Sequence, residues 1–331
     1  MLDRRTEAWG NAQTIVDAQT VMDYVVDDAA QAKCVDPIEF LDELTEYLEN
    51  PPSANGATMP WQNTHDKLRF RPGEVTLYGG INGHGKSLIV GQIAMGLVAQ
   101  DQKVMIISLE MKPAATLARM CVQCCQSEKP SQAYISEWMA AVTHNLRVVA
   151  HEGMADPELI YACVRYAHAI GYQHVVIDNL MHCVAGTDDY NAQKNFVVRL
   201  HELAMMGDGK GLHIHLVHHI RKMEDELKMP GKFDLHGGIS VTNAVDQCVI
   251  VYRNRIKEKK CRELNPTQDA LDMPDCMLSV VKNREGQWEG VIPLWFVPGC
   301  KQFVATSKKR AMNLLPSVMP ANTGVNASQK P

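Results

Sequence analysis

Several features are scarce or missing in this sequence, and each absence excludes a class of protein. No apolar run is long enough to span a membrane, and residues 1–7 carry charges of both signs without the apolar core of a signal peptide. The ten cysteines include a single cluster, Cys121, Cys124 and Cys125, and no second pair stands at metal-ligand spacing. We therefore expect reduced, structural thiols in a cytoplasmic protein.

Neither sign of charge dominates the composition. The 331 residues include 33 Lys+Arg and 38 Asp+Glu, which gives a formal net charge of -5, and 46% of them are hydrophobic. These proportions exclude global disorder and a surface that is basic all over. A basic lining inside an otherwise acidic particle is compatible with them.

What the sequence does contain is a regular alternation of strand-like and helix-like segments between Gly73 and about Val304. Continuous apolar runs such as 103–109 and 174–178 are typical of strands that are buried on both faces. Helical patterns lie between such runs, over 112–126, 157–169 and 191–206 among others. This order predicts an α/β fold with a mostly parallel sheet and helices on both faces.

The segments that flank this core, taken as residues 66–304, have a different character. Residues 1–65 are expected to form a helical arm over 11–49 followed by a linker over 50–65. Asp36 and Pro37 give a strong helix start, as N-cap and first helical residue. The arm either packs on its own chain or docks on a neighbouring subunit. Residues 305–331, which contain no acidic residue, are expected to be a disordered tail.

The most specific motif is the octet at residues 80–87, Gly-Ile-Asn-Gly-His-Gly-Lys-Ser, which matches G-x-x-x-x-G-K-[ST]. An apolar run precedes it and a helix-like run follows it, which is the context that this motif requires. Backbone N–H groups of such a loop bind phosphates at a helix N-terminus, while the lysine reaches the β- and γ-phosphates and the serine binds Mg²⁺. The predicted nucleotide contacts are Gly80, Asn82, Gly83, His84, Gly85, Lys86 and Ser87.

Hydrolysis of the nucleotide also requires a carboxylate near Mg²⁺ and a group that orients water. Asp178 ends a strand at the carboxyl edge of the sheet, where α/β proteins bind ligands, so it is the candidate Walker-B acid. Glu110 ends another strand at the same edge and could deprotonate the attacking water, although a carboxylate at a helix N-terminus would look the same. His219 follows the strand at 213–217 and could sense the γ-phosphate. Its strand also carries histidines on the same face, a pattern that leaves a zinc site open, but no carboxylate or cysteine completes that site.

A late motif, Lys282-Asn283-Arg284, ends a strand and precedes a hairpin-like return. Its spacing from the other motifs does not assign Arg284 to a site. An arginine at the edge of a sheet could reach the γ-phosphate of a neighbouring subunit, where such a residue accelerates hydrolysis by about 10³–10⁵-fold.

In this order, the motifs resemble the RecA-like core of the hexameric replicative helicases of the DnaB class, over about residues 66–300. Residues 108–111, Ser-Leu-Glu-Met, are typical of DnaB. Residues 219–222, His-Ile-Arg-Lys, are closer to the phage helicase–primase and Twinkle branch, since DnaB itself has glutamine in place of His219. The resemblance implies that Lys86 and Ser87 bind phosphate and Mg²⁺ and that Asp178 is the Walker-B acid. It also implies that Glu110 is the catalytic base and that His219 senses the γ-phosphate. Arg284, with Lys282 beside it, would be supplied by the neighbouring subunit.

The resemblance also implies DNA-contacting loops at 181–190, 220–236 and 236–243. The candidates for DNA contact are Arg221, Lys222, Lys228, Lys232, Gly237 and Gly238. The expected partners are single-stranded DNA in the central channel of a homo-hexameric ring, and a separate primase and polymerase. The sequence departs from the family in that no primase or collar domain is expected ahead of the motor. In relatives a helix before the motor packs on the adjacent subunit, so the resemblance implies the same contact for the arm at 11–49.

We therefore expect a Mg²⁺-dependent ring helicase that hydrolyses ATP or a dNTP, moves 5′ to 3′ on single-stranded DNA and unwinds duplex at a replication fork. The small size suggests a phage or mobile element, and hence a host cytoplasm. Two alternatives use the same core. One is a recombination-type ATPase that forms filaments on DNA, and the other is a regulatory ATPase of the KaiC type whose slow turnover is indifferent to DNA.

Overall fold

The computed structural model describes residues 36–51, 55–184, 189–207, 211–220, 225–235, 238–286 and 288–318. It divides the chain into two units, 1–51 and 52–331. In the first unit, the 3-10 turn η1 (Pro37–Phe40) leads into α3 (Leu41–Glu49), and Pro37 occupies the first helical positions after an extended Asp36. The helix is therefore confirmed over its described part, and the rest of the predicted segment, 11–35, lies outside the described residues.

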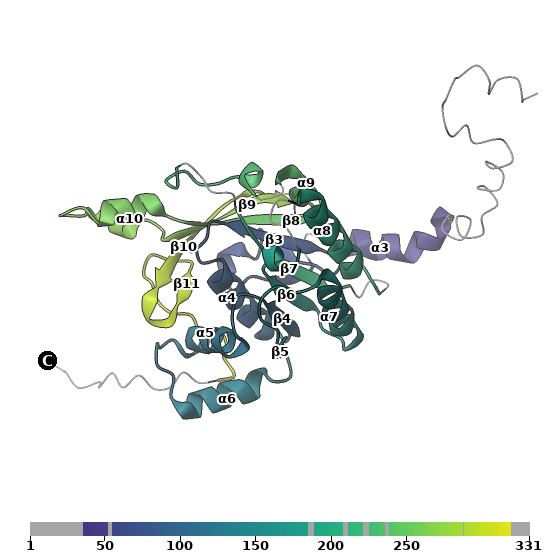
Figure 1. Ribbon diagram of the computed structural model, residues 1–331, viewed down its shortest axis with the longest axis horizontal. Coiled ribbons are helices and arrows are strands. Elements are labelled where there is room, and N and C mark those ends of the chain that lie inside the picture. The colour runs from purple at the N-terminus through teal and green to yellow at the C-terminus, as the bar shows by residue number, and fades with distance from the viewer. Residues whose placement is uncertain are drawn as a thin grey trace, which may run out of the picture. The chain divides into compact units, whose positions relative to one another are not determined.

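The second unit is built on a sheet of nine strands in the order β11-β10-β9-β8-β3-β7-β6-β4-β5 (Figure 1). The strands from β5 to β8 in this order are parallel, whereas β9, β10 and β11 are added as antiparallel strands. Their bounds are β3 (Val75–Gly80), β4 (Val104–Ser108), β5 (Leu146–Val148), β6 (His174–Asp178), β7 (His213–His219), β8 (Gln247–Arg253), β9 (Cys276–Asn283), β10 (Gly290–Val297) and β11 (Gln302–Val304). A small antiparallel pair, β1 (Ala57–Thr58) and β2 (Arg69–Phe70), stands apart from this sheet.

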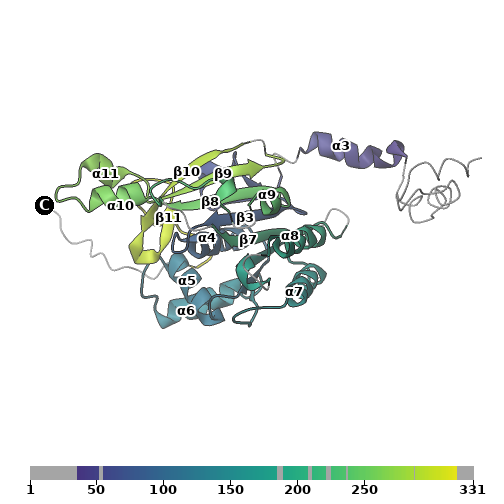
Figure 2. The ribbon, with the colours of Figure 1, turned by 45° about the horizontal axis from the view of Figure 1, so that its top comes forward.

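Helices cover both faces of the sheet (Figures 1 and 2). One face packs against α4 (Lys86–Val98), α5 (Pro113–Cys125) and α6 (Gln132–Val142), and the other against α7 (Pro157–Ala169), α8 (Tyr190–Ala204) and α9 (Gly238–Asn243). Successive strand residues alternate between the two cores, so Ile106 belongs to the first and Ile107 to the second. The predicted fold class, a mostly parallel sheet with helices on both faces, is confirmed.

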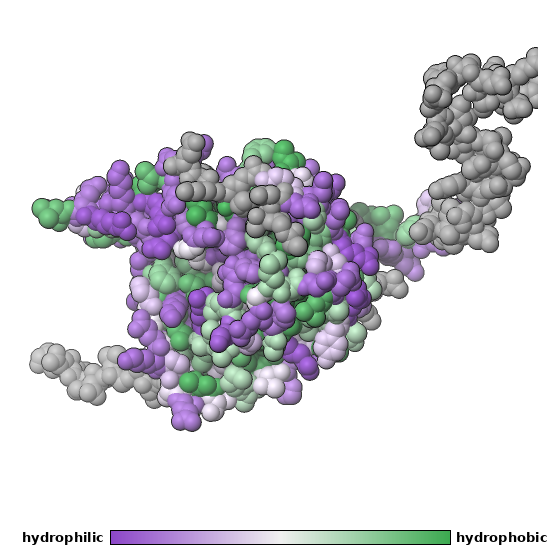
Figure 3. All heavy atoms as spheres, in the orientation of Figure 1, coloured by the Kyte–Doolittle hydropathy of each residue, from purple (hydrophilic) through white to green (hydrophobic). Residues whose placement is uncertain are grey.

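Several boundaries differ from the sequence prediction for reasons that are local. Strand β7 was expected to end at residue 217, but it continues to His219 because the last residues pair with Gly79 and Gly80 of β3. The helices α6, α10 (Arg255–Cys261) and α11 (Gln268–Asp272) were not predicted. The last two project from the end of the sheet between β8 and β9 (Figures 1 and 2), and hydrophilic side chains gather over α10 (Figure 3).

Two segments that were expected to lie outside the packed core belong to it. Residues 305–318 are not a disordered tail, because Leu314, Leu315 and Val318 are at most 4% exposed within the core, and residues 319–331 lie outside the described residues. The second half of the expected linker is also packed. Trp61 is buried, and its indole nitrogen donates a hydrogen bond of 2.7 Å to the carbonyl of Phe303. Among the described residues, no helix has the length and apolar character that a bilayer span requires.

Candidate functional site

The glycine loop of residues 80–87 joins the buried end of β3 to the first turn of α4, as predicted. Gly83 and Gly85 have φ angles of 77° and 90°, in the left-handed region that glycine adopts readily. A Cβ atom on Gly80 would lie 2.7 Å from the carbonyl oxygen of Val251. The glycines are thus required by the path of the loop, which leaves its N–H groups at a helix N-terminus, where anions bind.

Next to this loop lies a cavity with a volume of about 590 Å³, formed where β3, β4, β6 and β7 end. Most of the residues predicted for the nucleotide site line it, namely Asn82, Gly83, Gly85, Lys86, Ser87, Glu110, Asp178 and His219. Parallel strands end at one edge of the sheet, which is why motifs far apart in the sequence meet here.

Lys86 is 5% exposed, and its Nζ donates hydrogen bonds to the carbonyls of Gly80 (2.8 Å) and Ile81 (3.2 Å). Burial lowers the pKa of Lys86 to about 8, and the nearby carboxylates Asp178 and Glu110 oppose this effect. The amine therefore remains mostly protonated at neutral pH, as the binding of phosphate oxygens requires.

Asp178, at the end of β6, is 7% exposed. Burial raises its pKa, while a hydrogen bond from Ser87 lowers it. Its Oδ1 is buried without a hydrogen-bond partner. A hydroxyl and a carboxylate in contact, with one buried oxygen unpaired, are the hard oxygen ligands that Mg²⁺ prefers, so this pair fits the ion.

Glu110 and His219 are joined by Asn179, a residue that the sequence reasoning left without a role. The amide nitrogen of Asn179 donates to Glu110 and lies 2.7 Å from Nε2 of His219, and its oxygen lies 3.1 Å from Nδ1 of His182. Nε2 of His219 is 3.3 Å from Oε1 of Glu110. Asn179 directly follows Asp178, and this adjacency was the only signal in the sequence.

The electrostatics of this cluster keep Glu110 ionised. The hydrogen bond from His219 is the largest influence that lowers the pKa of Glu110, and the positive charges of His219, His182 and Lys86 add to it, while burial acts in the opposite direction. An ionised carboxylate at the edge of the cavity can accept a proton from a water molecule.

Two residues of the predicted loop do not line the cavity. Gly80 contributes its carbonyl to Lys86, as described above. The side chain of His84 is 2% exposed, its Nδ1 accepts a hydrogen bond from the backbone N–H of Arg253 (3.2 Å), and its ring lies against Tyr252. Burial and the charges of nearby cations lower the pKa of His84 to about 4. Its imidazole thus anchors the loop to β8 and does not face the cavity.

The rest of the cavity wall comes from segments that the sequence reasoning did not assign to it. Phe296 and Pro298 form an apolar part, at the end of β10 and in the turn η5 (Pro298–Cys300). Arg119 of α5 and Lys301 add positive charge, and Leu88 completes the lining. Phe296, Pro298 and Lys301 reach the cavity because the antiparallel strands β9 to β11 return the chain to this edge, a topology that no motif indicated.

Arg284 and Lys282 lie at the opposite edge of the sheet from the glycine loop. Asn283 pairs with Gln247 of β8, which in turn pairs with Thr76 near the start of β3, whereas the glycine loop follows the other end of β3. Nζ of Lys282 donates to the carbonyls of the last residues of α9 and to that of Val245, which follows the helix, at 2.6 Å. The structure therefore does not bring these two residues to the cavity of their own chain.

The candidate DNA contacts are only partly described. Lys228 and Lys232 are exposed, and Nζ of Lys232 lies 5.5 Å from the ring centre of Phe233. The helix α9 begins at Gly238. The remaining candidates, Arg221, Lys222 and Gly237, lie outside the described residues.

The histidines of β7 have other partners than a metal. His213 and His215 are buried, and they contact Thr76 and Tyr78 of the neighbouring strand at 2.8 Å and 3.1 Å. Burial lowers the pKa of both imidazoles. Over the described ranges, no group of three or more His, Cys, Asp or Glu side chains could hold a metal ion.

A RecA-like α/β core with a glycine loop, a buried Asp–Ser pair and an ionised Glu at one edge defines a P-loop ATPase. The chain belongs to the family of the DnaB-like helicase C-terminal domain, whose model matches residues 66–305. It is therefore an ATP-hydrolysing DNA helicase.

Solved structures share this fold. The ATPase domain of a phage helicase has a TM-score of 0.67 and 17% identity, with 82% of this chain and 99% of that chain covered. A DnaB-like replicative helicase, described with its interactions with primase, has a TM-score of 0.64 and 17% identity, with 87% and 71% of the two chains covered. No curated protein matches this sequence.

Proposed function

We propose that the chain forms a ring, most simply a hexamer, that moves 5′ to 3′ on single-stranded DNA and unwinds duplex ahead of it. Each ATP site lies between two copies, with the cavity of one copy facing Arg284 of the next. The family membership supports the helicase activity. The ring, its direction and the shared sites are the finer part of the proposal.

The observation that carries the proposal is the placement of Arg284. The nucleotide cavity of the same chain lies at the opposite edge of the sheet from Arg284, so the guanidinium cannot contact the nucleotide that this chain binds. Its side chain is nevertheless 48% exposed, and it projects from a fixed backbone position. A cationic group in that place is available to a second copy, where it would stabilise the charge that develops on the γ-phosphate.

The residues of the cavity have distinct roles in this proposal. Lys86 binds the β- and γ-phosphates, and Ser87 with Asp178 would hold Mg²⁺, which neutralises charge on the phosphates. Glu110 accepts a proton from the attacking water. His219, joined to Glu110 through Asn179, reports the presence of the γ-phosphate to the segment that follows β7. The apolar surface of Phe296 and Pro298 receives the base of the nucleotide.

The helix α3 supports assembly from several copies. The apolar side chains of η1 and α3, namely Ile38, Phe40, Leu41, Leu44 and Leu48, are between 46% and 71% exposed, and no residue of either element is buried. Residues 36–49 carry acidic side chains and no basic one. An amphipathic helix of this kind is stable when its apolar face is covered. The surface of a neighbouring copy would cover this face. Separately, the exposed side chains of Lys228 and Lys232, which follow β7, would bind the phosphates of DNA in the central channel.

The test is an unwinding assay on forked DNA with Mg²⁺ and ATP, using substrates whose single 5′ or 3′ tail allows loading in one direction only. We expect unwinding from the 5′ tail and none with Lys86→Ala. Electron microscopy of the same samples should show closed rings. Unwinding from the 3′ tail alone would overturn the direction, and filaments on DNA would favour the recombination-type alternative.

A further inference from the structure

One buried carboxylate connects Arg284 to the start of β3, at the edge of the sheet opposite the glycine loop. Asp246 directly precedes β8, and its side chain is 5% exposed. Its Oδ1 accepts a hydrogen bond of 2.7 Å from Nη1 of Arg284. Its Oδ2 accepts from the backbone N–H of Val75 at 2.9 Å and lies 3.0 Å from Nε2 of His201 on α8. Every side of this carboxylate is therefore engaged by a donor.

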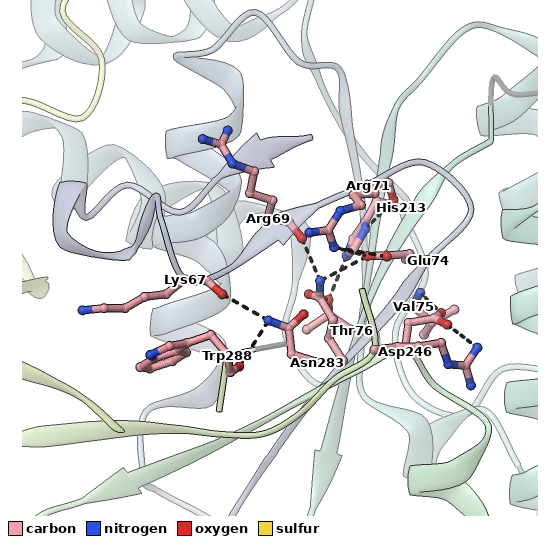
Figure 4. A network of polar contacts seen from close by, with 12 residues as sticks. Lys67, Arg69, Arg71, Glu74, Val75, Thr76, His213, Asp246, Asn283 and Trp288 are labelled. Carbon is pink, nitrogen blue, oxygen red and sulfur yellow. Dashed lines mark hydrogen bonds and ion pairs between the residues drawn. The ribbon is translucent and has the colours of Figure 1, made fainter. Parts of the chain in front are cut away.

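The backbone repeats the same connection. The N–H of Arg284 donates to the carbonyl of Asp246 (3.0 Å), and the N–H of Asp246 donates to the carbonyl of Val75 (3.0 Å). Figure 4 shows Asp246 beside Val75, within the polar network at the base of β3. Both the main chain and the side chain of Arg284 are thus fixed to the strand that leads into the glycine loop.

This arrangement limits where the guanidinium can point. A free arginine side chain loses rotamer entropy when it must reach a phosphate. Asp246 holds one guanidinium nitrogen, while about half of the side chain stays exposed. Burial opposes the ionisation of Asp246, but donors from His201 and Val75 and the charges of His201 and Arg284 keep its pKa below the ordinary value.

We propose that Asp246 is a positioning residue for Arg284, and that His201 and the N–H of Val75 fix the carboxylate in turn. The proposal rests on the role of Arg284 at the ATP site of a neighbouring copy. It adds that the arginine is oriented before the neighbour arrives, so that little of its freedom is lost when the shared site forms. Asp246 touches no nucleotide and acts only through Arg284.

The test is Asp246→Asn in the full-length chain. An amide of the same shape must turn its NH₂ group toward Arg284 or toward Val75 and His201, so one donor faces another donor. Misplacement of a catalytic group by about 1 Å costs roughly 100-fold in rate. We expect kcat for DNA-stimulated ATP hydrolysis to fall by about 10- to 100-fold, with KM for ATP little changed because the cavity of the same chain is intact. Asp101→Asn, at an exposed aspartate that accepts a side-chain hydrogen bond from Asn145, is the matched control and should keep full activity.

A double-mutant cycle separates positioning from general damage to the fold. If Asp246 acts through Arg284, the pair Asp246→Asn/Arg284→Ala should be no slower than Arg284→Ala alone. Three results would overturn this inference and leave the shared site standing. The first is that the losses of kcat in the two single variants multiply in the double variant. The others are a raised kcat for Asp246→Asn, or a normal kcat for Asp246→Asn while Arg284→Ala is inactive. Full activity of Arg284→Ala would instead overturn the shared site itself.

Discussion

Replacing His219 with glutamine should move the acidic limb of the pH–activity profile to higher pH while activity at neutral pH is retained. Nε2 of His219 lies 3.3 Å from Oε1 of Glu110, and this contact is the largest influence that lowers the pKa of Glu110. Glutamine keeps a polar group at this position without the charge. Because Glu110 must be ionised to accept a proton, a higher pKa delays its activation as the pH rises.

The size of the shift follows from the geometry. An opposite charge at this distance lowers the pKa of a carboxyl group by about 1–3 units. The side chains of Glu110 and His219 are 36% and 18% exposed, so solvent screens part of the interaction. We therefore expect a shift of about one pH unit, or roughly 1.4 kcal/mol, and a smaller shift at high salt.

The assay is kcat for ATP hydrolysis at saturating ATP, measured from about pH 3.5 to pH 9 so that it includes the acidic limb of the unaltered protein. His144→Gln, at an exposed histidine, is the control and should leave the profile unchanged. An acidic limb that stays in place in His219→Gln would refute the reasoning, because it would show that His219 does not set the ionisation of the catalytic base or that Glu110 is not that base.

Three further predictions test other parts of the account. The hydroxyl of Tyr252 donates to the carbonyl of Leu227 (2.8 Å), in the loop that is expected to contact DNA. Tyr252→Phe removes this hydrogen bond, so stimulation of ATP hydrolysis by oligo-dT should fall about fivefold, while the rate without DNA is kept. A lower rate without DNA would contradict this prediction. Leu315→Ala should lower the free energy of unfolding in urea by about 2–4 kcal/mol, whereas Leu264→Ala, at a side chain that is 97% exposed, should change it by less than about 0.5 kcal/mol. Burial raises the pKa of Glu74 to about 7, so folding stability should fall as the pH rises from about 4.5 to 7 and then level off. Glu74→Gln should remove this slope, and equal slopes in urea titrations of both proteins would refute the assignment.

Much of the core was predictable because its strands are short apolar runs that end in polar residues. The parallel strands and the flanking helices follow from this pattern, and the residues that end at one edge can be grouped from the sequence alone. The register was not predictable. Strand β7 gains His218 and His219 by pairing with β3, which no local pattern of charged and aromatic residues indicates.

Which residues line the cavity could be predicted where a motif has a fixed backbone geometry, but not where the direction of a side chain decides. His84 belongs to the loop motif, but its imidazole turns toward Arg253 and Tyr252, away from the cavity. Asn179 was visible only as a neighbour of Asp178, and its contacts depend on three segments that meet in space. Phe296 reaches the cavity only because the sheet continues with antiparallel strands.

The segment after residue 304 was misjudged on composition. Its asparagine, serine and proline content favours disorder, but Leu314 and Leu315 are buried in the core. The backbone of Met312 is held by the side chain of Gln302, with distances of 2.7 Å and 2.8 Å. A few apolar residues at irregular spacing give no periodic signal, yet they suffice to pack an extended segment onto a core that is already formed.

The measurement that tests the central claim most directly is steady-state ATP hydrolysis with and without single-stranded DNA, at protein concentrations at which the chain assembles. The account predicts strong stimulation by DNA, which Lys86→Ala abolishes. It also predicts that Arg284→Ala loses the stimulated rate but still binds nucleotide. Slow hydrolysis by an assembled oligomer that DNA does not change would contradict the motor and would favour a regulatory ATPase.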